Sequence, residues 1–274
     1  MSTDIYDIAL IVDGNGIYGA KNTIRSVLLN SGAVSISVID IGMAAVHAKE
    51  LLGLSPCIRI VSVPPQLSPW LENFSLRGYA HVSKAAYLKL LLHRILPEVD
   101  KLIYLDTDTL VFDNVRNIPC ENFDDDFVGV TWTTTQVHAG KIRLGLGQRY
   151  FNSGVMVCNL KKWRENSIED EFLNWYQINK LKMKFNDQEV LNGVFDGRNF
   201  EIGKRWNISQ REVFFADANL KCRNIQEIGI LHFNGAVKYW HDGYEAHVVS
   251  NPDLFAAVKK MLSEIGFHRE MLQS

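Results

Sequence analysis

The chain contains the stretch Leu102-Ile-Tyr-Leu-Asp106-Thr107-Asp108-Thr, in which a short apolar run leads directly into two aspartates. An apolar run of this length, bounded by polar residues, is typical of a buried strand. Carboxylates two residues apart on an extended segment point to the same side and converge. Because like charges held close are costly unless a cation lies between them, the pair predicts a site for Mg²⁺ or Mn²⁺. A solvated acidic turn is the alternative that this stretch alone leaves open.

Similar apolar runs recur on both sides of this stretch, with amphipathic helical patterns between them. Strands are predicted at residues 8–12, 34–41, 58–63, 102–105, 128–131 and 155–158. Helices are predicted at residues 22–29, 44–52, 85–95, 161–179 and 187–195. This alternation predicts an α/β fold with a single open, mainly parallel sheet and helices on both faces.

The composition excludes several classes of protein. Of the 274 residues, 47% are apolar and 22% are charged, which is typical of a globular domain and not of a disordered chain. A net charge of -2 provides no basic field for nucleic acid. The four cysteines are widely spaced, so we expect reduced thiols. The first residues do not resemble a signal peptide, and no apolar run approaches a membrane span, so we expect a cytoplasmic location.

Two aspartates follow different predicted strands at the point where each strand ends. Asp13 comes directly after the first strand, and Asp106 comes directly after the fourth. In open α/β sheets, ligands bind beyond the carboxyl ends of the strands. We therefore expect both carboxylates at one rim of the sheet, near each other.

Three later segments carry residue types that a buried site would need. They are Tyr150-Phe-Asn152-Ser-Gly154, Asp187-Gln188-Glu189 and His232-Phe-Asn234-Gly235-Ala-Val-Lys238. A glycine with a nearby lysine suits phosphate, because backbone N–H groups and a point charge both attract anions. Each segment also has an interpretation without function: a turn before a core strand, a helix cap, or a histidine satisfied in the core.

Taken together and in this order, these segments resemble glycosyltransferase family 8, which groups bacterial lipopolysaccharide galactosyl- and glucosyltransferases with glycogenin-like proteins. The resemblance runs from about residue 8 to residue 240. It implies a GT-A (nucleotide-diphospho-sugar transferase) fold, with a catalytic domain over residues 1–245 and a helical extension over residues 246–274. It also implies a retaining, Mn²⁺-dependent enzyme that moves glucose or galactose from a UDP-sugar to a saccharide acceptor, in lipopolysaccharide or other surface-glycan synthesis.

The resemblance assigns roles to residues that match the family's motifs. The implied ligands of Mn²⁺, or of Mg²⁺ in its place, are Asp106, Asp108 and His232. Residues implied to bind the rest of the UDP moiety are Asp13, Asn15, Tyr18, Lys89, Thr107, Gly235 and Lys238. The pocket for the transferred sugar is implied to contain Asn152, Asp187 and Gln188, with Glu189 beside them as a further catalytic candidate.

Four positions depart from the family's pattern, and one of them is Tyr239, which stands where the family's Lys-Pro-Trp has proline. Gly16 occupies the place of an aromatic that stacks on uracil, which leaves Tyr18 as the candidate for that contact. Lys89 replaces an arginine, and a point charge does not reproduce a bidentate fork. Thr133 stands where some galactosyltransferase relatives carry an aspartate, so the sequence does not decide between glucose and galactose.

Since Gln188 is a poor nucleophile, we favour attack of the acceptor from the side on which UDP leaves.

Two segments predict further features. The long polar segment 133–149 is expected to close over the donor as a lid. The apolar stripe in residues 254–272 favours a helix packed on the domain; peripheral contact with a membrane that carries a lipid-linked acceptor is the alternative.

Two other functions remain as alternatives: a UDP-sugar-binding protein without transferase activity, and an aspartate-dependent phosphatase. The sequence does not determine the oligomeric state.

Overall fold

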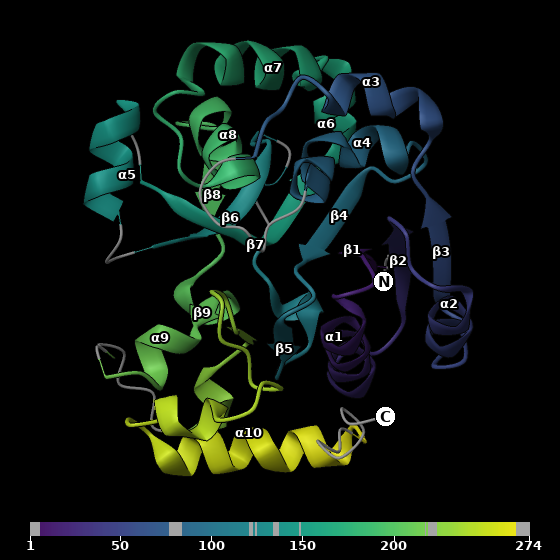
Figure 1. Ribbon diagram of the computed structural model, residues 1–274, viewed down its shortest axis with the longest axis vertical. Helices are drawn as coiled ribbons and strands as arrows, with labels where there is room; N and C mark the ends of the chain where they lie inside the picture. Colours follow the sequence, from purple (N-terminus) through teal and green to yellow (C-terminus); the bar gives the residue numbers. More distant parts are fainter. Residues whose placement is uncertain are drawn as a thin grey trace.

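The main sheet has seven strands in the order β3-β2-β1-β4-β7-β6-β8 (Figure 1). The computed structural model describes residues 6–76, 84–120, 123, 125–133, 137–147, 149–216, 218 and 224–266. The strands are β1 Tyr6–Val12, β2 Val34–Asp40, β3 Ile58–Ser62, β4 Lys101–Leu105, β6 Val128–Trp132, β7 Phe151–Asn159 and β8 Asn199–Glu201. β7 pairs antiparallel with β4 and β6, while the other paired strands of this sheet are parallel. The predicted α/β fold with a mainly parallel sheet is confirmed.

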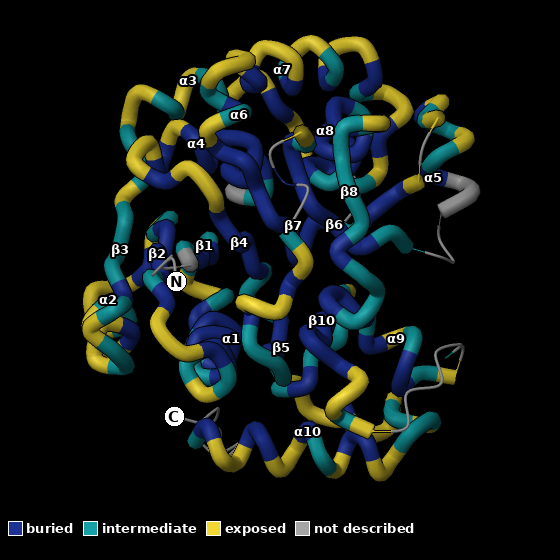
Figure 2. The backbone as a smooth tube through the Cα atoms, turned by 180° about the vertical axis from the view of Figure 1, so that it is seen from behind, coloured by how far each residue is buried: buried dark blue, intermediate teal, exposed yellow. Residues whose placement is uncertain are grey.

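Helices cover both faces of this sheet because its strands are apolar on both sides. One face is covered by α1 Ile17–Asn30 and α2 Ala45–Leu52. The other is covered by the 3₁₀ helix η2 Lys84–Leu91 and by α4 Leu92–Ile95, α6 Leu160–Glu165, α7 Ile168–Asn179 and α8 Asn186–Val194. Alternate residues of β1 enter different cores, with Ile8 and Leu10 on the α1 side and Ala9 on the other. Figure 2 shows β4 and β7 buried along most of their length.

A second, three-stranded sheet adds to the single sheet that the sequence predicts. It consists of β5 Thr109–Val111, β10 Ile230–His232 and β9 Ile208–Ser209, in the order β5-β10-β9. β10 runs antiparallel to β5, with His232 opposite Thr109, and parallel to β9. Since Asp108 directly precedes β5, this pairing carries His232 to the aspartate pair.

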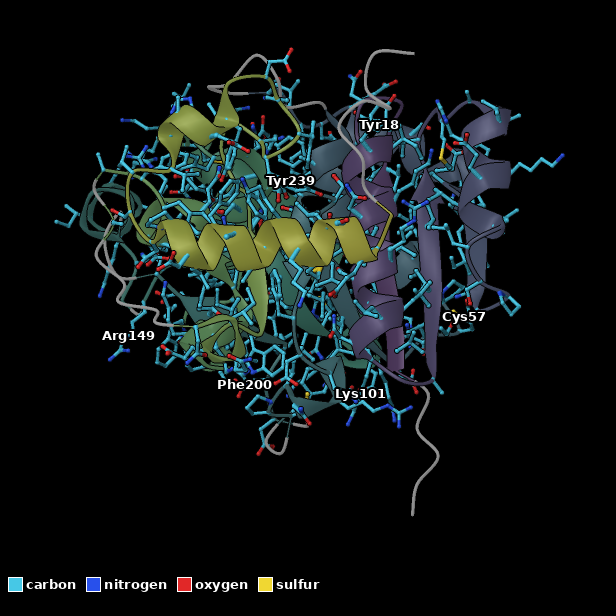
Figure 3. All side chains as sticks on the ribbon, turned by 90° about the horizontal axis from the view of Figure 1, so that it is seen from below. Tyr18, Cys57, Lys101, Arg149, Phe200 and Tyr239 are labelled. Atoms are coloured by element: carbon cyan, nitrogen blue, oxygen red, sulfur yellow. The ribbon has the colours of Figure 1, made fainter. Side chains whose placement is uncertain are left out.

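The C-terminal part of the described chain packs against this small sheet. α10 Pro252–Glu264 lies across the lower end of the molecule (Figure 1) and is seen from below in Figure 3. Its buried side chains, Leu254, Phe255 and Val258 among them, share one core with Phe214 and Tyr244. The apolar stripe therefore serves packing, as the favoured prediction had it; residues 267–272 of that predicted helix lie outside the described part.

Some predicted helices differ from the structure. The helix predicted over residues 161–179 is two helices, because Ser167 adopts a left-handed conformation with φ of 48°. Three acidic residues in the first turn of α7 favour a new helix start there. The helix predicted over residues 85–95 is mainly 3₁₀ and becomes α-helical only at Leu92. Segment 133–149 contains α5 Val137–Leu144, while residues 134–136 and 148 lie outside the described chain.

The remaining elements are short. They are η1 Pro65–Leu67, α3 Ser68–Leu71, η3 Val115–Asn117, η4 Lys204–Trp206, α9 Gln210–Val213, η5 Ile225–Glu227 and η6 Tyr244–His247. Among the residues that the structure describes, none of the helices combines the length and the apolar content that crossing a bilayer requires. Cys57, Cys120 and Cys158 are free thiols, and Cys222 lies outside the described ranges.

Candidate functional site

A cavity of about 400 Å³ lies beyond the carboxyl ends of β1, β2 and β4. Its wall combines the loop after β1, the turn after β4, the start of β7, the start of α8 and the loop after β10. Of the sequence-predicted residues, those that line it are Asp13, Asn15, Lys89, Asp106, Thr107, Asp108, Asn152, Asp187, Gln188, His232, Gly235 and Lys238. Asp13 and Lys238, 225 positions apart in the chain, therefore meet at one rim of the sheet. The prediction that Asp13 and Asp106 lie near each other at this rim is confirmed.

Two carboxylates and one imidazole form a cluster in this wall. Ligand atoms of Asp106, Asp108 and His232 all lie within 4.8 Å of one another. His232 Nε2 is 3.0 Å from Asp108 Oδ1 and 3.8 Å from Asp106 Oδ2. The other ring nitrogen, Nδ1, is 3.0 Å from Oδ1 of Asn207, which orients the ring. This donor set fits Mn²⁺ and Mg²⁺, which bind carboxylate oxygen and, for Mn²⁺ especially, imidazole.

Backbone contacts hold the cluster in place. The amide of Asp106 donates to the carbonyl of Gly154 at 2.8 Å, which ties the aspartate turn to β7. Gly154 also makes room for the histidine, since a Cβ built there would lie 2.0 Å from Cε1 of His232. The hydroxyl of Thr23 in α1 donates to the carbonyls of Thr107 and Thr109, at 3.0 and 2.7 Å. The aspartate turn is thus anchored on two sides.

Two lysines form ion pairs with three of the carboxylates of the cavity. Lys238 forms an ion pair with Asp108 and donates to the carbonyl of Phe233. Burial acts to raise the pKa of Asp108, but His232 and Lys238 outweigh it and hold that pKa well below its ordinary value. The ammonium of Lys89 lies 2.9 Å from Asp106 Oδ1 and 3.3 Å from Asp187 Oδ2.

The environment of Lys89 keeps this buried amine charged. Burial acts to lower its pKa, but the two neighbouring carboxylates, Asp106 and Asp187, outweigh that effect and raise it. For Asp187 the balance is the opposite, because burial raises its pKa more than Lys89 and the hydroxyl of Ser153 lower it. That hydroxyl donates to Asp187 Oδ2 at 3.0 Å.

Side-chain amides form the neighbouring part of the cavity. Asn152 Nδ2 donates to Oε1 of Gln188 at 2.9 Å, and Gln188 Nε2 donates to the hydroxyl of Tyr150 at 2.9 Å. The start of α8 presents Gln188 to the cavity, and β7 presents Asn152. Neutral donors and acceptors of this kind suit the hydroxyl groups of a sugar.

Two sequence-predicted residues do not reach the cavity. Tyr18 is 38% exposed and is absent from the cavity wall, with the ammonium of Lys21 6.0 Å from its ring centroid. Glu189 is fully buried, pairs with Arg143 of α5 and accepts from the amide of Lys184 at 2.7 Å. Its carboxylate therefore joins α8 to α5 rather than facing the site. Of segment 133–149, no described residue lines the cavity.

Tyr104, Trp240 and Asn207 are among the residues of the site that received no role from the sequence. Tyr104 donates to Asp106 Oδ1 at 2.8 Å, and Trp240 lines the cavity next to Gly19. Asn207 contacts both His232 and Asn152. Tyr104 lies inside the quoted strand, so the aspartate at i+2 is the signal that could have indicated it; no local pattern marks Asn207.

Comparison with known proteins identifies the family. The model of glycosyl transferase family 8 matches residues 7–243. The chain belongs to this family. A putative glycosyltransferase of Haemophilus influenzae is 32% identical over 175 residues, which cover 62% of this chain and 52% of that protein. Lipopolysaccharide 1,2-glucosyltransferase of Escherichia coli is 23% identical over 264 residues, 88% of this chain and 74% of that one.

Solved structures agree with the family 8 assignment. The galactosyltransferase LgtC, in complex with donor and acceptor sugar analogs, is 26% identical, with a TM-score of 0.74 over 92% of this chain and 99% of that chain. An active-site mutant of LgtC matches with a TM-score of 0.78 at 24% identity and confirms the GT-A fold. The family 8 chain spans about half the length of the first curated relatives that it matches, 52% and 44%. Family membership sets the phosphatase alternative aside.

Proposed function

We propose that the chain is a retaining, Mn²⁺-dependent hexosyltransferase that passes glucose or galactose from a UDP-sugar to a saccharide acceptor in surface-glycan synthesis. The observation that carries the proposal is the cluster of Asp106, Asp108 and His232 beside a cavity with an amide-lined end. The lipopolysaccharide glucosyltransferase and LgtC, the latter with donor and acceptor sugar analogs, support the substrate classes.

The residues of the cavity divide between the parts of the donor. Asp106, Asp108 and His232 would hold the cation, which when bound offsets negative charge on the diphosphate. Lys238 adds a second positive charge, and Gly235, with φ of 95°, exposes backbone at the same place. At the other end, Asp13 is fixed by the N–H groups of its own loop and faces the cavity, where it would bind the uridine.

The protein's own groups favour attack from the front face of the sugar. The bond from the anomeric carbon to the UDP oxygen breaks, and the acceptor oxygen bonds to that carbon on the same side. The acceptor's proton passes to a phosphate oxygen of the departing UDP. Gln188 offers an amide where a double displacement would need a carboxylate, and Asn152 and Gln188 would orient the sugar hydroxyls.

The neighbouring carboxylates are held by other groups. Asp187 contacts Lys89 and Ser153, and Glu189 pairs with Arg143 away from the cavity. A covalent glycosyl adduct on either carboxylate of the wild-type protein would overturn the front-face proposal.

One assay tests the function. The protein is incubated with Mn²⁺ and a panel of UDP-sugars, and UDP release is measured with and without candidate saccharides. We expect slow release from UDP-glucose or UDP-galactose, faster release with a suitable acceptor, and none after removal of metal with EDTA until Mn²⁺ is restored. Binding of the donor without turnover would instead support a UDP-sugar-binding protein.

A further inference from the structure

Asn207 is buried between His232 of the cation cluster and Asn152 of the amide-lined end of the cavity. This residue directly precedes β9 and is 6% exposed. β9 runs parallel to β10, with Ile208 opposite Leu231. In this register His232 lies opposite Ser209, and the side chain of Asn207, two residues before Ser209, contacts the imidazole of His232.

A continuous chain of hydrogen bonds passes through Asn207. His232 Nδ1 is 3.0 Å from Asn207 Oδ1. Asn207 Nδ2 donates to Asn152 at Oδ1 (3.2 Å) and at the backbone carbonyl (3.3 Å). From there the chain continues through Asn152 Nδ2 to Gln188 Oε1, and through Gln188 Nε2 to the hydroxyl of Tyr150. One buried side chain thus joins a cation ligand to the amides of the sugar pocket.

The direction of the hydrogen bonds in this chain follows from the backbone amide of Gly154. The amide of Gly154 donates to Asn152 Oδ1 at 2.9 Å, so that oxygen is the acceptor and Asn207 must present its NH₂ group to it. The carbonyl oxygen of Asn207 then faces His232, whose Nδ1 must carry a hydrogen. With a hydrogen on Nδ1, the lone pair of Nε2 is available to a cation beside Asp106 and Asp108.

We propose that Asn207 is a positioning residue that couples the cation site to the sugar pocket. The inference rests on the proposed function, and it concerns how one side chain sets the tautomer of His232 and the amide orientation of Asn152 and Gln188 together. Loss of its oxygen affects the cation site, whereas loss of its NH₂ group affects the sugar pocket.

Two substitutions separate these effects. Asn207→Ala removes both contacts, so we expect Mn²⁺ affinity to fall by roughly 10- to 100-fold together with a fall in donor turnover. Asn207→Asp keeps an acceptor for His232 but turns a second oxygen toward the two acceptor oxygens of Asn152. Its Mn²⁺ affinity should stay within a few-fold of wild type, while KM for the donor rises and kcat falls.

A third variant controls for the loss of any buried asparagine. Asn159 is also 6% exposed, and it accepts from the amide of Lys162 and donates to the carbonyl of Phe123 at the far end of β7. Asn159→Ala should lower stability without changing Mn²⁺ affinity.

The measurements are Mn²⁺ titrations by electron paramagnetic resonance and steady-state UDP release. Wild-type protein that binds no Mn²⁺ would overturn the proposed function and this inference together. Wild-type protein that binds Mn²⁺ while Asn207→Ala binds it equally well would overturn the inference alone. Equal losses of Mn²⁺ affinity in Asn207→Ala and Asn207→Asp would refute the separation of the two roles.

Discussion

Gly154 faces the ring of His232, and replacing it with alanine tests whether that ring belongs to a cation site. A Cβ at this position would lie 2.0 Å from Cε1, 2.6 Å from Nδ1 and 2.8 Å from Nε2 of His232. Ordinary contacts begin at 3.4 Å, so the ring or the strand must move by about 1.4 Å. Ligand distances in metal sites are held to within roughly 0.2 Å, so a shift of this size removes the ligand.

Movement of β7 away from His232 would relieve the clash with the added Cβ but would not preserve the cation site. The carbonyl of Gly154 accepts from the amide of Asp106, so a displaced strand pulls a second ligand with it. Disturbing groups that only support a ligand costs roughly 10- to 100-fold in metal affinity, and we expect Gly154→Ala to lose at least that much.

The assay is Mn²⁺ titration of Gly154→Ala beside wild type, with circular dichroism to establish that both are folded. Gly32→Ala is the matched control, because a Cβ at Gly32 meets nothing within 4 Å. A folded Gly154→Ala protein with wild-type Mn²⁺ affinity would refute the assignment of His232 as a ligand.

Three further predictions concern other groups. Burial outweighs Glu169 and holds the pKa of His93 below 6.5, so below that pH the unfolded chain takes up a proton that the folded chain does not. The free energy of unfolding should therefore fall as the pH falls below 6.5, by up to about 1.4 kcal/mol per pH unit. In His93→Gln, urea unfolding at a series of pH values should show a weaker dependence of that free energy on pH. Glu189→Gln should lower the free energy of unfolding, measured by thermal unfolding, by about 2 kcal/mol, because it breaks the buried ion pair with Arg143. The same substitution should leave KM for the donor unchanged. Lys89→Met should lower UDP release by roughly 10²–10³-fold, since it removes the charge between Asp106 and Asp187; wild-type rates would contradict its role.

The central strands were predictable because their apolar runs are uninterrupted and end in polar residues, as in β1 and β4. The break between α6 and α7 was not, because the polar residues 164–167 contain neither the glycine nor the proline that would mark the end of a helix. The left-handed backbone conformation of Ser167 separates the two helices. The strands of the small sheet have two or three residues, which is too few for a periodic pattern.

The sequence by itself determined the ligand chemistry of the site: carboxylates that end a buried strand, followed later by amides, a histidine and a lysine. The tertiary structure decided which of these groups meet and which do not. Packing placed Lys89 between Asp106 and Asp187 and turned Glu189 toward Arg143. The physical reason is that local periodicity encodes strands and helices, whereas a side-chain contact such as that of Asn207 with His232, 25 residues away, depends on how the strands pair.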